Sequence, residues 1–281
     1  MKKIISLILL ITFCLGVGRF WYWATDGFRL SRIEGFSKFG IGSEREFSRE
    51  AEAALSQRYY YLGRGRQCFA FQSEDGHYVL KFPRLDRYNE RLWFRLPLAD
   101  SYLTRRIENH TSRKEKLFSS FEISFEELRT ETALLAMFNS PKNGRKIEIV
   151  DRLGRIVKLP LEKTGFILQR KLPLFRDVFQ KAEVESLLDQ LLEVVVQIAE
   201  KGILTKDGSF LKNFGFDGTR AYQIDVGSFY RRTDLTSSQL YEASIHSNIE
   251  TLRVWLLQLD PSYLTLIDRK LVPIYERGNA L

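Results

Sequence analysis

Residues 206–229 read KDGSFLKNFGFDGTRAYQIDVGSF, and three polar residues in this stretch have the order expected of a magnesium site. Asp225 follows a short apolar segment and is closely followed by glycine, which is typical of a Mg²⁺ ligand. Asn213 can complete the metal coordination, and Asp207 can orient a hydroxyl nucleophile. The alternative is that these residues form two turns, since Asp, Asn and Gly tolerate unusual backbone angles.

A glycine-containing segment, LGRGRQCFA at residues 62–70, lies upstream between two expected strands. Gly63 and Gly65 allow backbone amides to approach phosphate groups closely. Lys81 lies on the following strand, eleven residues after Ala70, where its ammonium group can reach phosphate oxygens. The glycines alone would indicate an ordinary hairpin, and the position of the lysine favours a phosphate-binding loop.

Taken in order, these segments resemble the motifs of the protein-kinase-like superfamily, which includes protein kinases, aminoglycoside phosphotransferases and bacterial lipopolysaccharide kinases. The resemblance runs from about Tyr59 to Phe229. It implies an α+β fold with two lobes: an N-terminal lobe built on an antiparallel sheet and a reduced helical C-terminal lobe. It also implies ATP and Mg²⁺ as cofactors.

The resemblance implies roles for residues of the first lobe. Gly63 and Gly65 would form the phosphate loop, and Lys81 would bind the nucleotide phosphates and serve catalysis. Glu131 is the expected partner of Lys81 on a helix, and Glu127 lies one turn earlier as the reserve.

The resemblance also implies roles for residues further along the chain. Gln169 and Arg170 would belong to the hinge strand beside the adenine. Asp207 resembles the catalytic aspartate, Asn213 the metal-binding asparagine, and Asp225 the metal-binding aspartate.

The sequence departs from the superfamily pattern in several places. Cys68 replaces the third glycine of the phosphate loop, and Asn213 lies six rather than five positions after Asp207. Thr and Lys at residues 205–206 stand where His-Arg is usual. No Ala-Pro-Glu element follows Asp225, and only 56 residues remain after it, so the substrate platform must be reduced or different.

Apolar periodicity predicts the secondary structure around the motifs. Strands are expected at residues 59–62, 68–71, 77–82, 146–150, 155–159, 165–169, 204–205 and 221–224. Helices are expected at residues 43–57, 125–138, 184–200, 237–246, 248–259 and 264–270.

These elements suggest a division of the chain into four parts. They are residues 1–25, a lead-in at 26–57, an N-lobe at 58–171 and a reduced helical C-lobe at 172–281. The N-lobe includes a basic amphipathic insertion at 84–117. We expect this insertion to be a solvated helix that covers the fold, and the alternative is an element that binds a membrane surface or a partner.

The N-terminus carries a hydrophobic segment at residues 4–24, preceded by Lys2 and Lys3. Extended through its aromatic residues, it has about 20 residues, enough to cross a membrane if Arg19 snorkels. A signal anchor is favoured over a cleaved signal peptide. Positive charges on both sides of the segment leave the side of the membrane open.

Charge and cysteine content narrow the class of protein. Lys and Arg outnumber Asp and Glu by 43 to 35, a net charge of +8 that suits phosphate groups, anionic membranes or nucleic acid. No nucleic-acid partner is expected. Cys14 and Cys68 are the two cysteines and cannot form a disulfide framework, and the three histidines lack the spacing of a zinc site.

Three functions are compatible with the sequence. The first is a phosphotransferase acting on a hydroxyl group of a small molecule, a glycolipid or a protein. The second is a pseudokinase that binds nucleotide without transfer. The third is a membrane-anchored basic binding protein without a nucleotide site, in which residues 84–117 are the functional surface.

Overall fold

The computed structural model describes residues 2–35, 47–87, 101–137, 144–179 and 183–278. The described chain is of the α+β class, as the sequence predicts. It divides into two compact units. The first unit comprises Met1–Glu90 and Ala136–Leu168, and the second comprises Arg91–Leu135 and Gln169–Leu281.

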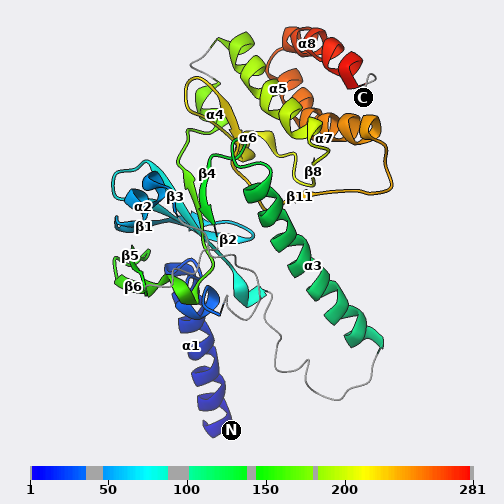
Figure 1. Cartoon of the computed structure of the whole chain (residues 1–281). Coiled ribbons are helices and arrows are strands. Elements are labelled where there is room, and N and C mark those ends of the chain that lie inside the picture. The colour runs from blue at the N-terminus through cyan, green and yellow to red at the C-terminus, as the bar shows by residue number, and fades with distance from the viewer. Residues whose placement is uncertain (1, 36–46, 88–100, 138–143, 180–182, 279–281) are drawn as a thin grey trace. The chain divides into compact units, whose positions relative to one another are not determined.

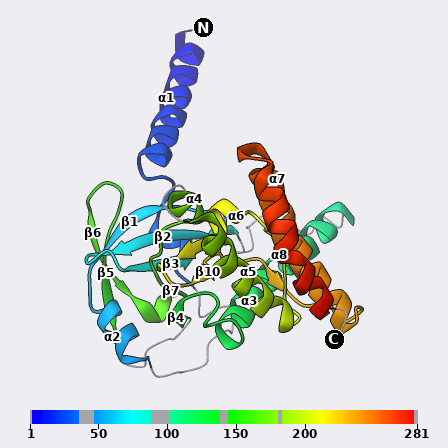
Figure 2. The same ribbon diagram turned by 90° about the horizontal axis from the view of Figure 1, so that it is seen from above.

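The first unit begins with α1 (Lys2–Ala24), a helix that extends away from the strands of that unit in both views (Figures 1 and 2). Lys3–Ala24 is 22 residues long with a mean hydropathy of 2.1, which is sufficient for a membrane span, although a signal sequence has the same properties. None of its most apolar stretch is buried. The next helix, α2 (Arg49–Leu55), is capped by Ser48, whose side chain accepts a hydrogen bond from Ala51 N.

A seven-stranded sheet has the strand order β4-β7-β3-β2-β1-β5-β6 (Figure 2). Its strands are β1 (Tyr59–Arg64), β2 (Cys68–Ser73), β3 (Tyr78–Pro83), β4 (Leu134–Met137), β5 (Lys146–Val150), β6 (Ile156–Pro160) and β7 (Ile167–Arg170). The hairpins β1–β2, β2–β3 and β5–β6 are antiparallel, and β1 runs parallel to β5. The chain passes between the two units within β4 and within β7.

Aromatic side chains form the core of the first unit. Phe28 is 3% exposed and packs edge-on against Phe69 and Phe71, with ring centroids 5.3 and 5.2 Å away. Phe71 in turn packs edge-on against Phe82 at 5.6 Å. Alternate residues of β2 point to this core, which is why the strand has the period of two that its sequence indicates.

The end of α1 is fastened to the end of β1. Arg64 donates a hydrogen bond to the hydroxyl of Tyr22 and forms an ion pair with Asp26 at 3.2 Å. Asp26 also accepts a hydrogen bond of 2.8 Å from Tyr61. Gly27 has a φ of +70° and lies so close to the Tyr22 ring that an added Cβ would be 2.6 Å from it. Only glycine fits this turn between α1 and the sheet.

Helices dominate the second unit. They are α3 (Ser101–Glu126), α4 (Phe175–Val178), α5 (Val184–Glu200), α6 (Phe210–Asn213), α7 (Ser237–Leu259) and α8 (Ser262–Gly278). Helix α5 buries one apolar face, and Gly202, with a φ of +64°, follows its end as the sequence predicts. Two small antiparallel ladders complete the unit: β8 (Leu204–Thr205) pairs with β11 (Phe229–Tyr230), and β9 (Phe214–Phe216) pairs with β10 (Ala221–Gln223).

The helix expected at residues 125–138 is wrong. Helix α3 ends at Glu126, a turn follows, and β4 begins at Leu134. All four residues of β4 are buried, and a short run of buried apolar residues has no periodicity that separates a strand from a helix. Ala133 has a φ of +54°, which turns the chain into the strand. Residue 138 lies outside the described residues.

Other differences from the sequence-based expectations are smaller. The two helices expected at 237–246 and 248–259 form the single helix α7, because Ser247 continues the helical backbone. Helix α8 is longer than the expected 264–270. Of the helix expected at 43–57, residues 43–46 lie outside the described residues, as do residues 88–100 of the basic insertion.

Replacing Phe28 by alanine is predicted to destabilise the chain by about 3–5 kcal/mol, the usual cost of removing a buried aromatic ring. Chemical denaturation of the chain in detergent, followed by circular dichroism, measures this change. Leu62→Ala is the matched control, because Leu62 is 49% exposed and its loss is expected to cost less than about 0.5 kcal/mol. Equal losses for the two variants would contradict the assignment of Phe28 to the core.

Candidate functional site

The two small ladders of the second unit hold the loops that carry Asp207, Asn213 and Asp225. Because β9 and β10 are antiparallel, Phe214 pairs with Gln223, and the residues just outside this pair are Asn213 and Ile224. The backbone N–H of Ile224 donates to the carbonyl of Asn213 at 2.7 Å. Asn213 is therefore bonded to the residue that precedes Asp225, at the open end of the β9–β10 hairpin.

The second ladder, β8 with β11, places the start of the loop that carries Asp207 beside the end of the loop that carries Asp225. Thr205 pairs with Phe229 across β8 and β11, and Lys206 N donates to the carbonyl of Ser228 at 3.0 Å. The loop that begins at Lys206 carries Asp207, and the loop that ends at Ser228 carries Asp225. Both loops therefore emerge from the same end of the ladders.

Asn213 closes the loop that carries Asp207. Its side-chain nitrogen donates to the backbone carbonyl of Asp207 at 3.0 Å, and the residue is 6% exposed. The seven-residue segment from Asp207 to Asn213 is thus joined at its two ends despite the extra residue. This bond uses the nitrogen of the carboxamide and leaves its oxygen, the atom that binds cations, as a potential ligand.

The two carboxylates of the site are accessible to solvent. Asp207 is exposed and accepts a hydrogen bond of 3.1 Å from Ser209 N. Asp225 is half-buried and accepts a hydrogen bond of 3.3 Å from Gly227 N. Carboxylate and carboxamide oxygens are the ligands that Mg²⁺ prefers, so the donor set of Asn213 and Asp225 fits this ion. Such a pair requires water and phosphate oxygens to complete the coordination.

Gly208 seats the loop on helix α7. A Cβ added to Gly208 would lie 2.1 Å from the carbonyl oxygen of Ser247, so only glycine permits this approach. The hydroxyl of Thr251 donates to the carbonyl of Gly208. The loop from Asp207 to Asn213, which is one residue longer than the superfamily pattern, is thus held against α7 at Gly208.

Helix α3 holds the segment after Asp225. The hydroxyl of Ser120 donates to the carbonyl of Val226 at 2.7 Å and accepts from Phe229 N at 2.7 Å, and both bonds are buried. Ser124, one turn later, also donates to Val226 at 3.2 Å. Sequence reasoning missed these serines, and their spacing of four on one helical face was the only signal of a shared role.

The hairpin between β9 and β10 is fixed at its turn by Asp217. Its carboxylate accepts hydrogen bonds from Thr219 N at 2.9 Å and from the Tyr222 hydroxyl at 2.8 Å. Burial raises the pKa of Asp217, but the hydrogen bonds outweigh it and hold the pKa at about 2. The carboxylate is therefore ionised at neutral pH and keeps the hairpin that positions Asn213 in register.

In the first unit, the sheet aligns the residues of the glycine motif. Gly63 pairs with Ala70 on β2, and Ala70 pairs with Lys81 on β3, so the three residues form one row across three strands. Residues paired across strands point to the same face of a sheet. The row therefore presents a lysine beside two of the smallest residues, which suits a bulky ligand that lies flat on the strands.

The glycines of the motif are not explained by packing. A Cβ at Gly63 would meet nothing within 4 Å, and one at Gly65 would be 3.5 Å from the Cys68 carbonyl, an ordinary contact. Neither has a positive φ. Gly63 follows an irregularity in the pairing of β1 with β2. Glycine in a strand costs stability, and close approach of a ligand is one reason for its presence.

The residues expected beside the adenine lie at the end of β7. Gln169 is 1% exposed, and its side-chain nitrogen donates to the carbonyl of Thr132 at 2.8 Å. The N–H of Arg170 donates to the carbonyl of Ala133 at 3.2 Å, and its side chain is exposed. The backbone at this position is thus fastened to the segment before β4.

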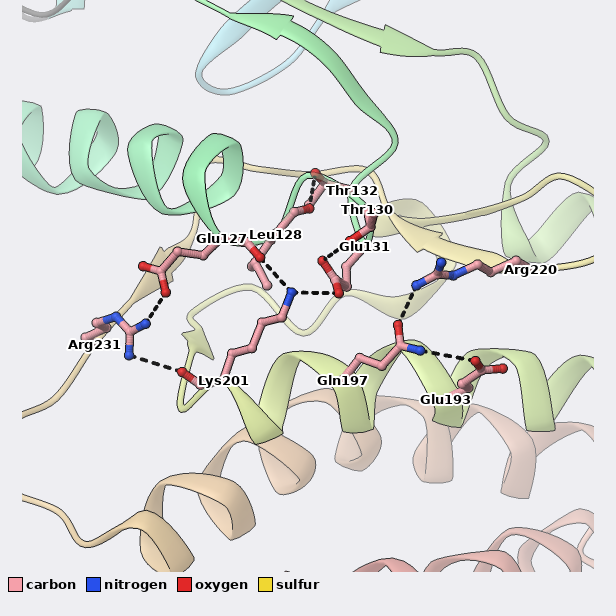
Figure 3. A network of polar contacts seen from close by, with 10 residues as sticks. All are labelled: Glu127, Leu128, Thr130, Glu131, Thr132, Glu193, Gln197, Lys201, Arg220 and Arg231. Atoms are coloured by element: carbon pink, nitrogen blue, oxygen red, sulfur yellow. Dashed lines mark hydrogen bonds and ion pairs between the residues drawn. The ribbon is translucent and has the colours of Figure 1, made fainter.

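Glu131 lies in the turn after α3 and not on a helix, so the expectation that it is a helical residue is wrong. Its carboxylate is bonded to Lys201 at 2.8 Å, and Lys201 also donates to the carbonyl of Glu127 at 2.6 Å (Figure 3). Arg231 forms an ion pair with Glu127 (Figure 3). The turn is therefore fastened to the end of α5, a role for Lys201 that sequence reasoning missed.

The main chain of Glu131 is also tied to the segment that carries Asp225. Its carbonyl accepts a hydrogen bond of 2.8 Å from Gln223 N, two residues before Asp225. The structure thus brings Asp207, Asn213 and Asp225 together in the second unit and aligns Gly63 with Lys81 in the first. The pairing of Lys81 with Glu131 stays a prediction.

Comparison with known proteins gives structural similarities only. No protein-family model matches the sequence. No curated protein matches it significantly.

The chain is similar to the solved structure of the bifunctional kinase-methyltransferase WbdD, with 16% identity, a TM-score of 0.35, and coverage of 77% of this chain and 43% of that one. The structure of WbdD with the kinase inhibitor LY294002 is 17% identical, has a TM-score of 0.37, and is matched over 78% of this chain and 45% of that chain. The Rio2 kinase-ADP/Mg²⁺-phosphoaspartate complex from Chaetomium thermophilum is 14% identical, has a TM-score of 0.34, and is matched over 76% of this chain and 66% of that chain. The chain thus spans less than half the length of WbdD.

Replacing Gly208 by alanine is predicted to destabilise the chain by about 1–3 kcal/mol, because the new methyl group collides with the backbone of α7. Thermal unfolding followed by circular dichroism measures the loss. Gly65→Ala is the control: its methyl group makes an ordinary contact, and we expect a change below about 0.5 kcal/mol. A Gly208→Ala variant as stable as this control would disprove the close contact.

Proposed function

We propose that this chain is a kinase-like phosphotransferase that uses ATP and Mg²⁺ and transfers a phosphoryl group to a hydroxyl acceptor. The observation that carries the proposal is the hydrogen bond between Asn213 and the Asp207 carbonyl, at the end of the ladders from which Asp225 also emerges. Three residue types suited to phosphoryl transfer converge there in the order that the superfamily resemblance implies.

In the second unit, each polar residue has a proposed role. Asn213 and Asp225 would hold Mg²⁺ with their side-chain oxygens. Asp207, which is exposed, would accept the proton of the hydroxyl group and orient its oxygen for attack. ATP supplies the phosphoryl group when bound, and positioning and charge neutralisation account for most of the catalysis in such reactions.

In the first unit, the row of Gly63, Ala70 and Lys81 supports a phosphate-binding role. The lysine would place its charge against the phosphates, and the glycine would let backbone groups approach them. Gly65 would take part in the same phosphate-binding role. Glu131, Gln169 and Arg170 belong to the second unit, and for them we propose the nucleotide-binding roles that the superfamily resemblance implies. The fit rests on the small side chains of the row and on glycines that packing does not require.

We further propose that α1 is a membrane anchor. None of the most apolar stretch of its 22-residue segment Lys3–Ala24 is buried, and its last turn is tied to the sheet by Tyr22 and Arg64. A lipid-linked or glycolipid hydroxyl would then be close to the enzyme, and a small-molecule or protein acceptor is also compatible with the site. Use of ATP as the phosphoryl donor would require the site to face the cytosol.

One observation favours a pseudokinase as the second candidate. The Asp207–Asn213 loop has one residue more than the superfamily pattern, and Asp207 is exposed at its start. A chain of this kind would bind nucleotide without transferring phosphate.

Addition of Mg²⁺ and ATP to the full chain in detergent is predicted to raise its thermal unfolding temperature. At a nucleotide concentration of 100 Kd the stabilisation is about 2.7 kcal/mol. Asp225→Ala removes a metal ligand and is expected to abolish most of this effect. Equal stabilisation of the variant and the native chain would contradict the metal assignment.

The same measurement separates the two candidates when it is combined with Asp207→Ala. This variant is expected to keep nucleotide-dependent stabilisation, while phosphate transfer or basal ATP hydrolysis falls by about 100-fold or more. Stabilisation of the native chain without any transfer or hydrolysis would select the pseudokinase. A native chain with no response to Mg²⁺ and ATP would favour the binding protein without a nucleotide site.

Gly63→Ala tests the glycine row. We predict unchanged or slightly higher stability, by up to about 1 kcal/mol, because the methyl group meets no atom and alanine restricts the unfolded chain. The Kd for Mg²⁺-ATP is expected to rise several-fold, as measured by calorimetry, because the methyl group keeps the phosphates from the backbone. A Kd equal to that of the native chain would rule out a phosphate at this position.

A further inference from the structure

The last turn of α1 ends in aromatic residues, and the turn between β5 and β6 lies against it. Arg152 donates to the carbonyl of Trp23 at 3.3 Å, and its guanidinium lies 5.8 Å from the centre of the Trp23 ring. The guanidinium of Arg155 lies 5.4 Å from the centre of the Trp21 ring. These contacts all lie within the first unit, so the turn and the end of α1 form one continuous surface.

This turn exposes apolar side chains. Leu153 is 43% exposed and Ile156 is 56% exposed, and both lie beside residues that contact the tryptophans. The tryptophans are exposed as well, with 41% for Trp21 and 67% for Trp23. A single exposed aliphatic residue needs no explanation, but Leu153 and Ile156 adjoin the residues that contact the two exposed tryptophans, and neighbouring exposed apolar side chains of this kind are typical of an interaction surface.

The position of these residues along α1 is the reason to infer a lipid bilayer as the partner. Trp21 and Trp23 lie in the last turn of the candidate span Lys3–Ala24. Tryptophan and tyrosine at the end of a span are typical of the interface between hydrocarbon and water. A turn in contact with these rings lies at the same level, and its aliphatic side chains continue the apolar surface of the helix.

We propose that residues 151–156, the β5–β6 turn, are a second membrane contact, with Leu153 and Ile156 inserted in the interfacial region of the bilayer that α1 enters. This inference rests on the proposed membrane insertion of α1. The first unit is then held at two points, so that it cannot rotate freely about the helix axis. The sheet has a fixed face toward the lipid.

Charge on the turn sets the kind of lipid. Arg155 is neutralised by Asp151 at 2.6 Å, and Lys158 is paired with Glu148 at 3.4 Å. Glu148 is also paired with Arg58 at 2.8 Å, so two basic side chains share this carboxylate and, together with Arg152, leave the surface with a net positive charge. The contact depends mainly on apolar and aromatic side chains, so zwitterionic bilayers suffice and anionic lipid adds a small effect.

The sheet provides a matched control at its opposite end. Tyr59, at the start of β1, pairs with Ser73, whereas Arg64, at the end of β1, contacts Tyr22 of α1. The β2–β3 turn follows Ser73 and therefore lies at the end of the strand remote from α1. His77 in this turn is exposed, as Leu153 is, and should not meet lipid.

The test uses the full chain with the photoreactive residue p-benzoylphenylalanine at Leu153, at His77 or at Leu10. Each variant is reconstituted into phosphatidylcholine vesicles, with or without phosphatidylglycerol, and irradiated. Intact-protein mass spectrometry then counts lipid adducts. Leu10 lies within the candidate span and is 59% exposed, so its adduct reports insertion of α1 alone.

The expected result is lipid adducts at Leu153 and Leu10 and none at His77, in both kinds of vesicle. Adducts at Leu10 with none at Leu153 would overturn the second contact and leave the anchor intact. No adducts at either position would overturn both. Equal labelling at Leu153 and His77, or protein adducts at Leu153, would show that lipid is not the specific partner of this turn.

A second reporter guards against disturbance of the turn. The photoreactive residue at Ile156, on the first residue of β6, is expected to give lipid adducts as Leu153 does. Circular dichroism of each variant must match the native chain. A folded Ile156 variant without lipid adducts would also overturn the proposal.

Discussion

The hydrogen bond from the Asn213 side chain to the Asp207 carbonyl is the constraint on which the candidate site depends. It closes the loop from Asp207 to Asn213, in which Phe210 is buried against Phe175 and Phe214. Leaving a buried amide of this kind without its acceptor costs about 1–3 kcal/mol, which is enough to favour the closed loop over open alternatives. The two ladders then hold the closed loop beside the segment that carries Asp225, so the proposed metal ligands Asn213 and Asp225 are held near each other by the backbone.

Much of the fold could be predicted from the sequence, because its elements have clear periods. The hairpins of the sheet, the helix at 184–200 and the strand at 204–205 occur where alternation or helical spacing indicates them. The segment at 134–137 could not be assigned correctly, because buried runs have no polar face to set a period. The single helix α7 was divided in the prediction because local spacing does not reveal that two apolar faces are continuous.

The candidate site could be predicted in part. The order of the glycines, the lysine and the acidic residues can be recognised in a single sequence. The structure places Gly63 and Lys81 in one row of the sheet and joins Asn213 to Asp207. The supporting residues could not be predicted: Ser120 and Lys201 act through contacts between segments distant in sequence. A serine on a helix or a lysine after one is common, and only the packed fold shows that each is bonded to a particular carbonyl or carboxylate.

The attachment of Arg64 to Tyr22 ties the N-terminal helix α1 to the glycine-containing segment at residues 62–70. Arg64 stands between two glycines, and it is the tyrosine ring and Asp26 that hold it. Proteolytic removal of α1 would remove Tyr22 and leave the Arg64 guanidinium paired with Asp26 alone. A processed form of the protein would therefore have a looser glycine turn than the full-length form. Cleavage after α1 would therefore alter the glycine-containing turn as well as remove the apolar helix.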